Sequence, residues 1–321
     1  MKPTLIYYSI SKYREENKSL LHRLFDIIEL DNPSFDTPEI LAKASAIIAP
    51  LGYYVGQEKM DRMPNLKVIG SNTTGHPHID VEYAAEKGIA VHTLKYEKNL
   101  LKTITPTAEL TWGLIIAVTR NMRSAMRSVI EGNWDRRPFG GPAMLSRMSL
   151  GLAGLGRLGS IVAEYGLAFG MKVSFYDPYI TEYNQALNRV DSLEELVSSN
   201  DIISIHIPHE PETENIFDRN TFDKFKNGAY FINTSRGELV DHDALIDAMK
   251  KGILAGAAMD VFPDEFNPDF DIRKEKLWSY LQTHENLIVT PHIAGSTEDA
   301  WRLTERRTID LMCKTLGLED K

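Results

Sequence analysis

Short apolar runs alternate with amphipathic stretches along most of the chain, a pattern typical of parallel sheets covered by helices. In the first hundred residues the apolar runs predict four strands, at 4–9, 46–50, 66–71 and 89–93. Apolar residues at helical spacing between them predict helices at 20–30, after Thr37-Pro38 and at 81–88. We therefore expect one α/β domain in this part of the chain.

A longer apolar stripe then predicts a single helix from Thr107 to about Gly132. After it the alternation resumes and predicts six further strands, the number in a complete Rossmann sheet, at 150–153, 172–176, 202–207, 229–233, 254–260 and 287–290. A last helix is expected at 296–316, packed on the first domain. The predicted fold class is α/β with two doubly wound parallel-sheet domains, a discontinuous one of 1–100 plus 296–321 and an inserted one of 101–295.

A glycine-rich segment, Gly154-Leu155-Gly156-Arg157-Leu158-Gly159, follows the predicted strand 150–153. Between a strand and a helix this spacing is typical of dinucleotide binding: the first glycine permits a tight turn, the second a close pyrophosphate and the third close helix packing. The helix N-terminus itself favours an anion. Asp177 ends the next strand, 18 positions after Gly159, where its carboxylate would accept bonds from ribose hydroxyls and repel a 2′-phosphate. This favours NAD over NADP.

Ionisable side chains follow other predicted strands of the same sheet at their C-terminal ends, the edge where ligands of open α/β sheets bind. Arg236 follows 229–233, and its forked guanidinium suits a carboxylate, although a surface pairing with Glu238 or Asp241 is the alternative. His292 follows 287–290 and can transfer a proton near neutral pH. An acid of this kind is needed to convert a 2-oxo acid into an alcohol.

Two acidic positions near this edge have more than one interpretation. A carboxylate bonded to the far ring nitrogen of His292 would fix its tautomer and favour its protonated form. Glu265, 27 residues earlier, could supply it, but spacing alone does not separate it from Asp264, Asp269 and Asp271. Asp260 could bond the amide of a nicotinamide or cap a helix.

Composition narrows the classes of function. The 321 residues are 43% hydrophobic, enough for two domains with their own cores, and the net charge of −9 without a long basic run argues against a nucleic-acid partner. No apolar run approaches the ~20 residues of a membrane span, and the first residues do not form a signal peptide, so we expect a cytoplasmic protein without a membrane partner. Cys313 is the single cysteine, and no closely spaced histidine pair lies with carboxylates on one element, so no metal is expected. His76-Pro77-His78 comes nearest, but its proline and its loop setting favour a feature of a substrate loop over a zinc site.

In their order along the chain, these motifs resemble those of the D-isomer-specific 2-hydroxyacid dehydrogenases. The similarity extends over nearly the whole length and includes Tyr176-Asp177-Pro178, His206-Ile207-Pro208 with Glu212-Thr213, Asn233-Thr234-Ser235-Arg236-Gly237, Asp260-Val261-Phe262 and Thr290-Pro291-His292. It implies a flavodoxin-like substrate domain, a Rossmann NAD-binding domain and the catalytic triad Arg236, Glu265 and His292. The residues expected to contact NAD, from the motifs and the resemblance together, are Gly154, Gly156, Arg157, Leu158, Gly159, Asp177, His206, Pro208, Thr213, Thr234, Ser235, Asp260 and Gly295.

The resemblance also indicates a substrate loop. Members of the family hold the substrate carboxylate with backbone N–H groups of a loop that corresponds to 72–76, which implies contacts from Thr73, Thr74 and Gly75. The segment 290–297 looks most like the phosphoglycerate dehydrogenase branch. The segment 50–54, where that branch tends to carry arginines for the substrate phosphate, has no cation, and we expect a short form without that branch's regulatory domain.

The leading hypothesis is an NAD-dependent oxidoreductase that transfers a hydride between nicotinamide and C2 of a D-2-hydroxy or 2-oxo acid, with a 3-phosphoglycerate-like substrate as one candidate. The alternative is an NAD(H)-sensing binding protein of the same fold with little turnover, and the intact triad weighs against it. An enzyme acting on formate or a phosphorus acid is disfavoured by the His–Glu pair. The resemblance further implies a homodimer formed through 107–132 and the following segment, although this apolar stripe could equally be buried within one chain.

Overall fold

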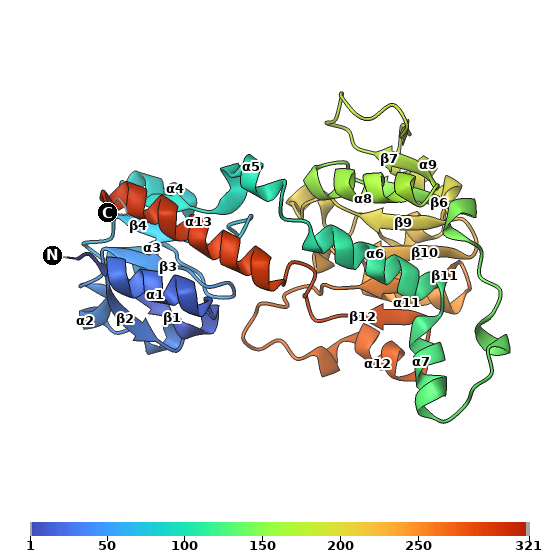
Figure 1. Cartoon of the computed structure of the whole chain (residues 1–321), viewed down its shortest axis with the longest axis horizontal. Coiled ribbons are helices and arrows are strands. Elements are labelled where there is room, and N and C mark those ends of the chain that lie inside the picture. The colour runs from blue at the N-terminus through green and yellow to red at the C-terminus, as the bar shows by residue number, and fades with distance from the viewer. Residues whose placement is uncertain (1, 319–321) are drawn as a thin grey trace. The chain divides into compact units, whose positions relative to one another are not determined.

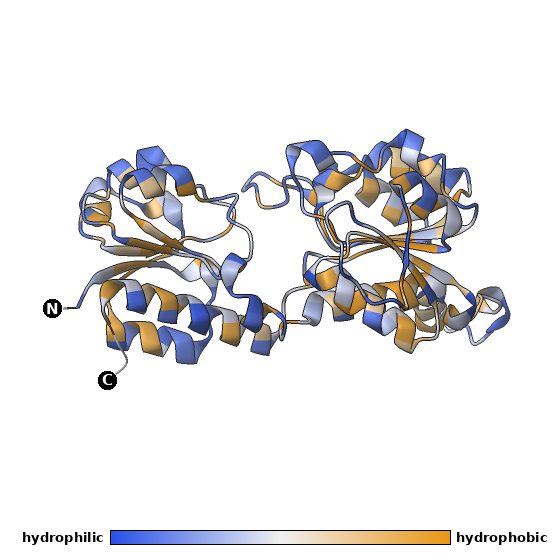
Figure 2. Cartoon of the chain, turned by 90° about the horizontal axis from the view of Figure 1, so that it is seen from above, coloured by the Kyte–Doolittle hydropathy of each residue, from blue (hydrophilic) through white to orange (hydrophobic). Residues whose placement is uncertain are grey.

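The computed structural model describes residues 2–318, which form two compact units (Figure 1). Unit 1 consists of Met1–Ile104 and Thr297–Lys321, and unit 2 of Thr105–Ser296; residues 1 and 319–321 of unit 1 lie outside the described part. In each unit the apolar strands form a layer between amphipathic helices (Figure 2). Each sheet is buried on both faces, as expected when crossover helices connect parallel strands.

Unit 1 contains a five-stranded parallel sheet in the order β2-β1-β3-β4-β5. This 2-1-3-4-5 order is the flavodoxin-like one that was expected. The strands are β1 Thr4–Tyr8, β2 Asp26–Leu30, β3 Ala46–Ile48, β4 Val68–Gly70 and β5 Ala90–His92, and the helices are α1 Glu15–Leu24, α2 Pro38–Leu41, α3 Gln57–Asp61, α4 Val81–Glu86, α5 Lys98–Leu101 and α13 Glu298–Leu316. The C-terminal helix α13 packs directly on this sheet, because a Cβ added at Gly70 would lie 2.2 Å from the sulfur of Met312. Cys313 is buried in the same core.

The prediction of one helix over 20–30 is wrong. Helix α1 ends at Leu24, and Asp26–Leu30 pairs with β1 as an additional strand. The segment Asp-Ile-Ile-Glu-Leu is too short for its apolar pattern to separate a helix from a strand, and its two β-branched isoleucines favour the strand.

Unit 2 contains a seven-stranded parallel sheet in the order β12-β11-β10-β9-β6-β7-β8. Counted from β8, this is the Rossmann order 3-2-1-4-5-6 with one more strand, which confirms the predicted fold class. The strands are β6 Ser149–Ala153, β7 Lys172–Tyr176, β8 Asn188–Arg189, β9 Ile202–Ile205, β10 Ala229–Asn233, β11 Leu254–Met259 and β12 Leu287–Val289. The helices are α6 Pro106–Thr119, α7 Met122–Ile130, α8 Arg157–Ala168, α9 Leu193–Ser199, α10 Arg219–Phe222, α11 His242–Lys250 and α12 Lys276–Thr283.

Short 3₁₀ helices occur in the connections of both units, at η1 Ser9–Ser11, η2 Pro33–Phe35, η3 Leu94–Tyr96, η4 Arg137–Phe139, η5 Leu145–Arg147, η6 Pro211–Thr213, η7 Gly237–Leu239 and η8 Ile272–Lys274. None of the helices within residues 2–318 has the length and apolar character needed to cross a membrane.

Two further predictions for unit 2 need correction. The six-strand count missed β8, because two polar residues carry no recognisable strand pattern. The single helix over 107–132 is two helices, α6 and α7, separated by Asn121 in the left-handed conformation (φ 52°), which asparagine tolerates better than most residues. Arg123 then directs α7 by donating to the backbone carbonyls of Leu281, His284 and Leu287.

Candidate active site

The glycine loop after β6 has the geometry that its spacing predicts. Gly154 has a φ of 96°, and a Cβ there would lie 2.7 Å from the carbonyl oxygen of His206. A Cβ at Gly159 would lie 2.3 Å from the carbonyl oxygen of Gly154, so helix α8 approaches the loop closely. Gly156 is exposed, with no atom within 4 Å of a Cβ position, and it begins α8 without a side-chain cap. The open backbone and the uncapped N–H groups therefore fit the pyrophosphate of a dinucleotide.

Asp177 follows β7 and lies beside this loop. Its Oδ2 accepts a bond from the backbone N–H of Leu155 at 2.9 Å, and its Oδ1 accepts one from Tyr179 at 2.9 Å. Oδ1 also accepts from the N–H of Ile180 at 3.3 Å. A carboxylate offers about four acceptor positions, so one position of Oδ2 stays open for a hydroxyl group. The predicted cofactor residues Arg157 and Leu158 form the first turn of α8.

The loop after β9 carries His206, Pro208 and Thr213. Burial lowers the pKa of His206 to about 4, so its ring is neutral near pH 7, and Nε2 lies 3.0 Å from the hydroxyl of Ser204. Thr213 closes the loop, because its hydroxyl donates to the carbonyl of Pro208 at 2.9 Å. The histidine is thus suited to shaping a pocket and unsuited to proton transfer.

Arg236 lies in the loop that follows β10, and its side chain is exposed. The neighbouring Asn233 is fully buried; its Oδ1 accepts from the N–H of Ser235 at 2.9 Å and its Nδ2 donates to the carbonyl of Arg236 at 2.7 Å. Among the described residues Arg236 makes no ion pair with the two acids considered as surface partners, because Glu238 accepts from the backbone of Asp264 and Asp241 caps α11. Within residues 2–318 its guanidinium donates only to the carbonyl of Ser235.

His292 and Glu265 form a direct pair. Nδ1 of His292 lies 2.6 Å from Oε1 of Glu265, whose side chain is only 12% exposed. The geometry selects Glu265 among its acidic neighbours, and Asp271 is instead paired with Arg273. Within residues 2–318 no partner holds Nε2 of His292, so this nitrogen is available to a reacting group.

Asp260 holds the loop that carries His292, a role that sequence reasoning missed. It is fully buried, and its carboxylate accepts from the N–H groups of Ile293 at 3.0 Å and Ala294 at 2.8 Å and from the hydroxyl of Thr290. Its carbonyl accepts from the N–H of His292 at 2.9 Å. It caps no helix, since Thr297 caps α13. A contact between Asp260 and NAD stays a prediction.

Two other predicted cofactor residues lie at the same edge of the sheet. Thr234 is nearly buried, and its hydroxyl lies 2.7 Å from that of Thr111 in α6. Gly295 is exposed, and a Cβ there would approach the hydroxyl of Thr107 only to 3.8 Å.

In unit 1, the predicted substrate loop follows β4. The hydroxyl of Thr73 donates to the carbonyl of Gly75 at 2.6 Å, and Ser71 links it to the buried His78, with 3.0 Å to Thr73 and 3.1 Å to Nε2 of His78. Burial lowers the pKa of His78 to about 4. In the described part of the chain, the backbone N–H groups of Thr73, Thr74 and Gly75 have no acceptor, which fits the binding of an anion. Ser71 gave no signal in the sequence, because a polar residue in a loop predicts no particular contact.

Comparison with known proteins agrees with this geometry. Residues 112–294, more than half of the chain, match the model of the D-isomer specific 2-hydroxyacid dehydrogenase, NAD binding domain. The chain belongs to this family. The match also confirms NAD, the cofactor predicted from the glycine loop. Within residues 2–318 no cluster of three potential metal ligands occurs.

Several family members can be compared with the chain. It is 36% identical over 265 residues to D-3-phosphoglycerate dehydrogenase of Methanocaldococcus jannaschii, covering 82% of this chain but 48% of that protein, so it spans about half the length of this relative. It is 34% identical to hydroxypyruvate reductase of Thermotoga maritima, covering 87% of both chains. The structure of a D-lactate dehydrogenase from Aquifex aeolicus, complexed with NAD and lactic acid, superposes with a TM-score of 0.82 at 29% identity, over 98% of this chain and 96% of that one.

Proposed function

We propose that this family member is an NAD-dependent oxidoreductase that transfers a hydride between nicotinamide and C2 of a D-2-hydroxy or 2-oxo acid. The observation that carries the proposal is the bond of 2.6 Å between His292 and Glu265, with Arg236 in the same unit. A histidine whose far nitrogen is held by a carboxylate, with its near nitrogen free, is the arrangement of a general acid and base. A binding protein would have no use for it.

Each residue of the triad has a distinct role in this proposal. Arg236 binds the substrate carboxylate and polarises the C2 carbonyl with its forked N–H groups. His292 donates the proton on Nε2 to the carbonyl oxygen during reduction and accepts it during oxidation. Glu265 keeps the other proton on Nδ1 and thereby orients the ring. When bound, NADH supplies the hydride that adds to C2.

The remaining predicted contacts complete the proposal. The glycine loop and the start of α8 hold the pyrophosphate, and Asp177 binds the ribose hydroxyls. Asp177→Ser should therefore reduce the preference in affinity for NAD over NADP, measured by titration of both cofactors. In unit 1, the free N–H groups of Thr73, Thr74 and Gly75 are proposed to bind the substrate carboxylate. A 3-phosphoglycerate-like acid is one candidate substrate, as is hydroxypyruvate.

A substrate panel tests the proposed function. NADH oxidation would be measured at 340 nm with 3-phosphohydroxypyruvate, glyoxylate, hydroxypyruvate and pyruvate, and NADH binding would be measured in parallel by calorimetry. Turnover with at least one acid, and formation of the D-alcohol, are expected. NADH binding without turnover on any acid of the panel would contradict the enzyme and favour an NAD(H) sensor.

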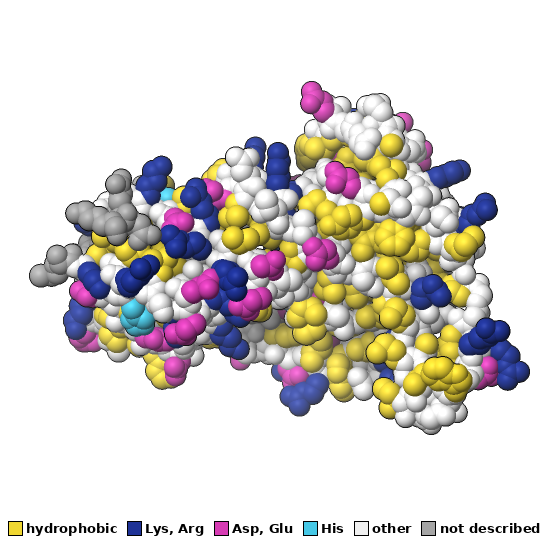
Figure 3. All heavy atoms as spheres, viewed as in Figure 1, with side chains coloured by type: hydrophobic (Ala, Val, Ile, Leu, Met, Phe, Trp, Pro, Cys, Tyr) yellow, Lys and Arg dark blue, Asp and Glu magenta, His cyan; other side chains and the backbone are white. Residues whose placement is uncertain are grey.

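We further propose that the chain forms a homodimer through α7 and the segment after it. No residue of α7 is buried, and its apolar side chains are exposed, among them Met126 at 61%, Ile130 at 84% and the nearby Trp134 at 91%. Hydrophobic side chains gather over the surface of unit 2 where α6 and α7 lie (Figure 3). An amphipathic helix with its apolar face in solvent is typical of an interface.

Light scattering after size-exclusion chromatography tests the dimer. The chain should elute at twice the monomer mass, and Met126→Glu should shift it to the monomer. A monomeric wild type would contradict the proposal.

We also propose a cytoplasmic location. Cell fractionation with a membrane marker as control tests it.

A further inference from the structure

The position of Arg236 depends on the short loop that follows β10. The side chain of Arg236 is exposed, and the residue lies three positions after the end of β10. Below it, the fully buried amide of Asn233 bonds twice to the loop, accepting from Ser235 N–H and donating to the Arg236 carbonyl. A buried amide with both halves bonded to the same short loop fixes that loop relative to the strand.

The same loop is constrained from the neighbouring strand. A Cβ at Gly237 would lie 2.1 Å from the carbonyl carbon of Phe262, so the backbone directly after Arg236 packs against the backbone that leads to Glu265. The carbonyl of Asn233 accepts from the N–H of Asp260 at 2.9 Å, and the carbonyl of Asp260 accepts from the N–H of His292. Asn233 thus stands at one end of a continuous set of bonds whose other end holds the proposed general acid.

The two halves of the amide are not equivalent. Many short polar side chains can accept from the N–H two residues ahead, as in Asx and ST turns. Donation to the carbonyl of Arg236 requires an N–H or O–H at the end of a side chain of this length, and an ionised aspartate has none.

We propose that Asn233 is the positioning residue for Arg236, and that the donor half of its amide carries this role. The inference rests on the proposed function, because it concerns the group that binds the substrate carboxylate. A misplacement of a binding group by about 1 Å can reduce catalysis about 10²-fold. Loss of the donor should therefore reduce kcat/KM for the 2-oxo acid about 10-fold to 10²-fold, with NADH affinity changed less than about threefold.

The variant Asn233→Asp isolates the donor, since it keeps the acceptor and nearly the same shape. Its protonated carboxyl group can donate like the amide, so the deficit in kcat/KM relative to wild type should shrink as the pH falls. The matched control is Asn200→Asp: Asn200 is equally buried and donates to the carbonyl of Leu196 at 2.8 Å, but it lies before β9, at the opposite edge of the sheet. The control should lose thermal stability while its kcat/KM stays within about twofold.

A second variant separates the lost donor from the new charge. Asn233→Ser is uncharged and can accept from Ser235 N–H, but it is too short to reach the carbonyl of Arg236. It should lose kcat/KM as Asn233→Asp does, without the pH dependence of the deficit. Asn233→Ser also tests the loss of the donor if Asn233→Asp does not fold. Full activity of Asn233→Ser, a pH-independent deficit of Asn233→Asp, or an equal loss in Asn200→Asp would each overturn the proposal.

Two measurements without turnover keep this test apart from that of the proposed function. Hydrogen exchange of the Ser235 amide should stay slow in Asn233→Asp, which keeps its acceptor. Affinity of the NADH complex for oxalate, a carboxylate probe that does not react, should fall about 10-fold in Asn233→Asp. If wild type turns over no acid of the panel, the proposed function fails while oxalate affinity still reports on Arg236. Unchanged oxalate affinity in an active enzyme overturns only the role of Asn233.

Discussion

The C-terminal edges of the two parallel sheets carry functional loops that are held in different ways. In unit 2 the loops with Arg236 and His292 are each held by a fully buried polar side chain. Asn233 is the last residue of β10, before Arg236, and Asp260 directly follows β11, the strand that pairs with the one before His292. In unit 1 the loop with Thr73 is held by hydroxyls, and its N–H groups have no acceptor among the described residues. Both loops are therefore fixed by buried side chains, since Ser71 is fully buried as well, but the loop of unit 1 keeps its own N–H donors free for a ligand.

This difference corresponds to two chemical tasks. Proton transfer and polarisation of a carbonyl require groups held in place before the substrate arrives, since reorganisation would add to the barrier. Binding of a carboxylate requires only free donors, and a loop can be altered there without disturbing the reacting groups. The family match falls on 112–294, within unit 2, while the relatives carry the names of different substrates. We expect changes at the His–Glu pair of unit 2 to lower kcat and changes in the loop of unit 1 to raise KM.

The largest effect is expected for His292→Ala in unit 2. If His292 is the general acid, its loss should lower kcat about 10²-fold to 10⁴-fold while NADH affinity is retained. Steady-state kinetics with the best 2-oxo acid of the panel would measure this. The control is His284→Gln, because His284 stacks on Tyr280 and precedes β12 at the other edge of the sheet. Turnover unchanged in His292→Ala would remove the proposed acid.

Much of unit 2 is predictable from the sequence, because its signals are local. The φ of 96° at Gly154 favours glycine over any other residue, so this turn is visible in the sequence as a glycine at a fixed spacing. The five-residue strand β6 ends where its apolar run ends. Arg236 and His292 each lie three positions after the end of an apolar strand. Glu265 could be separated from its acidic neighbours only by the resemblance, because its partner lies 27 residues away and the loop between them has no periodic pattern.

The parts that could not be predicted depend on contacts distant in sequence. Strand β2 pairs with β1 over a segment whose composition also suits a helix, and the bond between Arg14 and Glu305 spans 291 positions. The roles of Asn233 and Asp260 in holding loops could not be derived either, since a polar residue at a strand end can equally bind a ligand. Only the geometry shows that their polar atoms point back to the protein.

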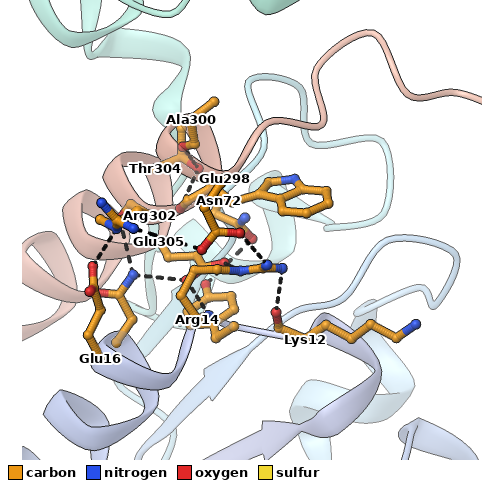
Figure 4. Close-up of polar contacts among 12 residues, drawn as sticks. Lys12, Arg14, Glu16, Asn72, Glu298, Ala300, Arg302, Thr304 and Glu305 are labelled. Carbon is orange, nitrogen blue, oxygen red and sulfur yellow. Dashed lines mark hydrogen bonds and ion pairs between the residues drawn. The ribbon is translucent and has the colours of Figure 1, made fainter.

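The second largest effect is expected for Glu305→Ala in unit 1, on stability. Glu305 is 2% exposed in α13 and accepts from the N–H of Arg14 at 2.8 Å and from the amide of Asn17 at 2.9 Å, so it joins α13 to the start of α1 (Figure 4). Alanine would leave the N–H of Arg14 and one N–H of the Asn17 amide without an acceptor, while the amide keeps its bond to the carbonyl of Arg302. This should cost about 3 kcal/mol of unfolding free energy. Urea unfolding followed by fluorescence would measure the loss.

The control for Glu305 is the variant Glu305→Gln. Burial raises the pKa of this carboxyl, so its ionised form is disfavoured, while a glutamine oxygen can still accept both bonds. For Glu305→Gln we expect the free energy of unfolding to fall by less than about 1 kcal/mol. In both variants kcat should stay within about twofold of wild type. A loss in Glu305→Gln as large as in Glu305→Ala would show that the charge, and not the acceptor, stabilises this contact.

A smaller effect is expected for His78 in unit 1, on the pH dependence of stability. Its pKa is about 4 in the folded chain and about 6.5 when unfolded, so the unfolded state binds the proton first as the pH falls. The contribution of neutral His78 to the free energy of unfolding is complete above pH 6.5 and decreases towards pH 4. At pH 5 it is smaller by about 2 kcal/mol. His78→Gln keeps a donor for Ser71 and should lose less stability between pH 8 and pH 5 than wild type. Equal losses would contradict the neutral state of His78.

The smallest effect is expected for Ser71→Ala, and it tests the comparison most directly. The substitution removes the hydroxyl that links Thr73 to His78, so the loop with the free N–H groups loses one constraint while these donors stay in place. KM for the 2-oxo acid should rise about tenfold, about 1.4 kcal/mol, with kcat within about twofold. The matched control is Ser45→Ala, because Ser45 donates to the carbonyl of Thr4 at the opposite edge of the same sheet. If kcat fell as much as KM rose, the loop would act on the reacting groups, and the division between binding in unit 1 and chemistry in unit 2 would not hold.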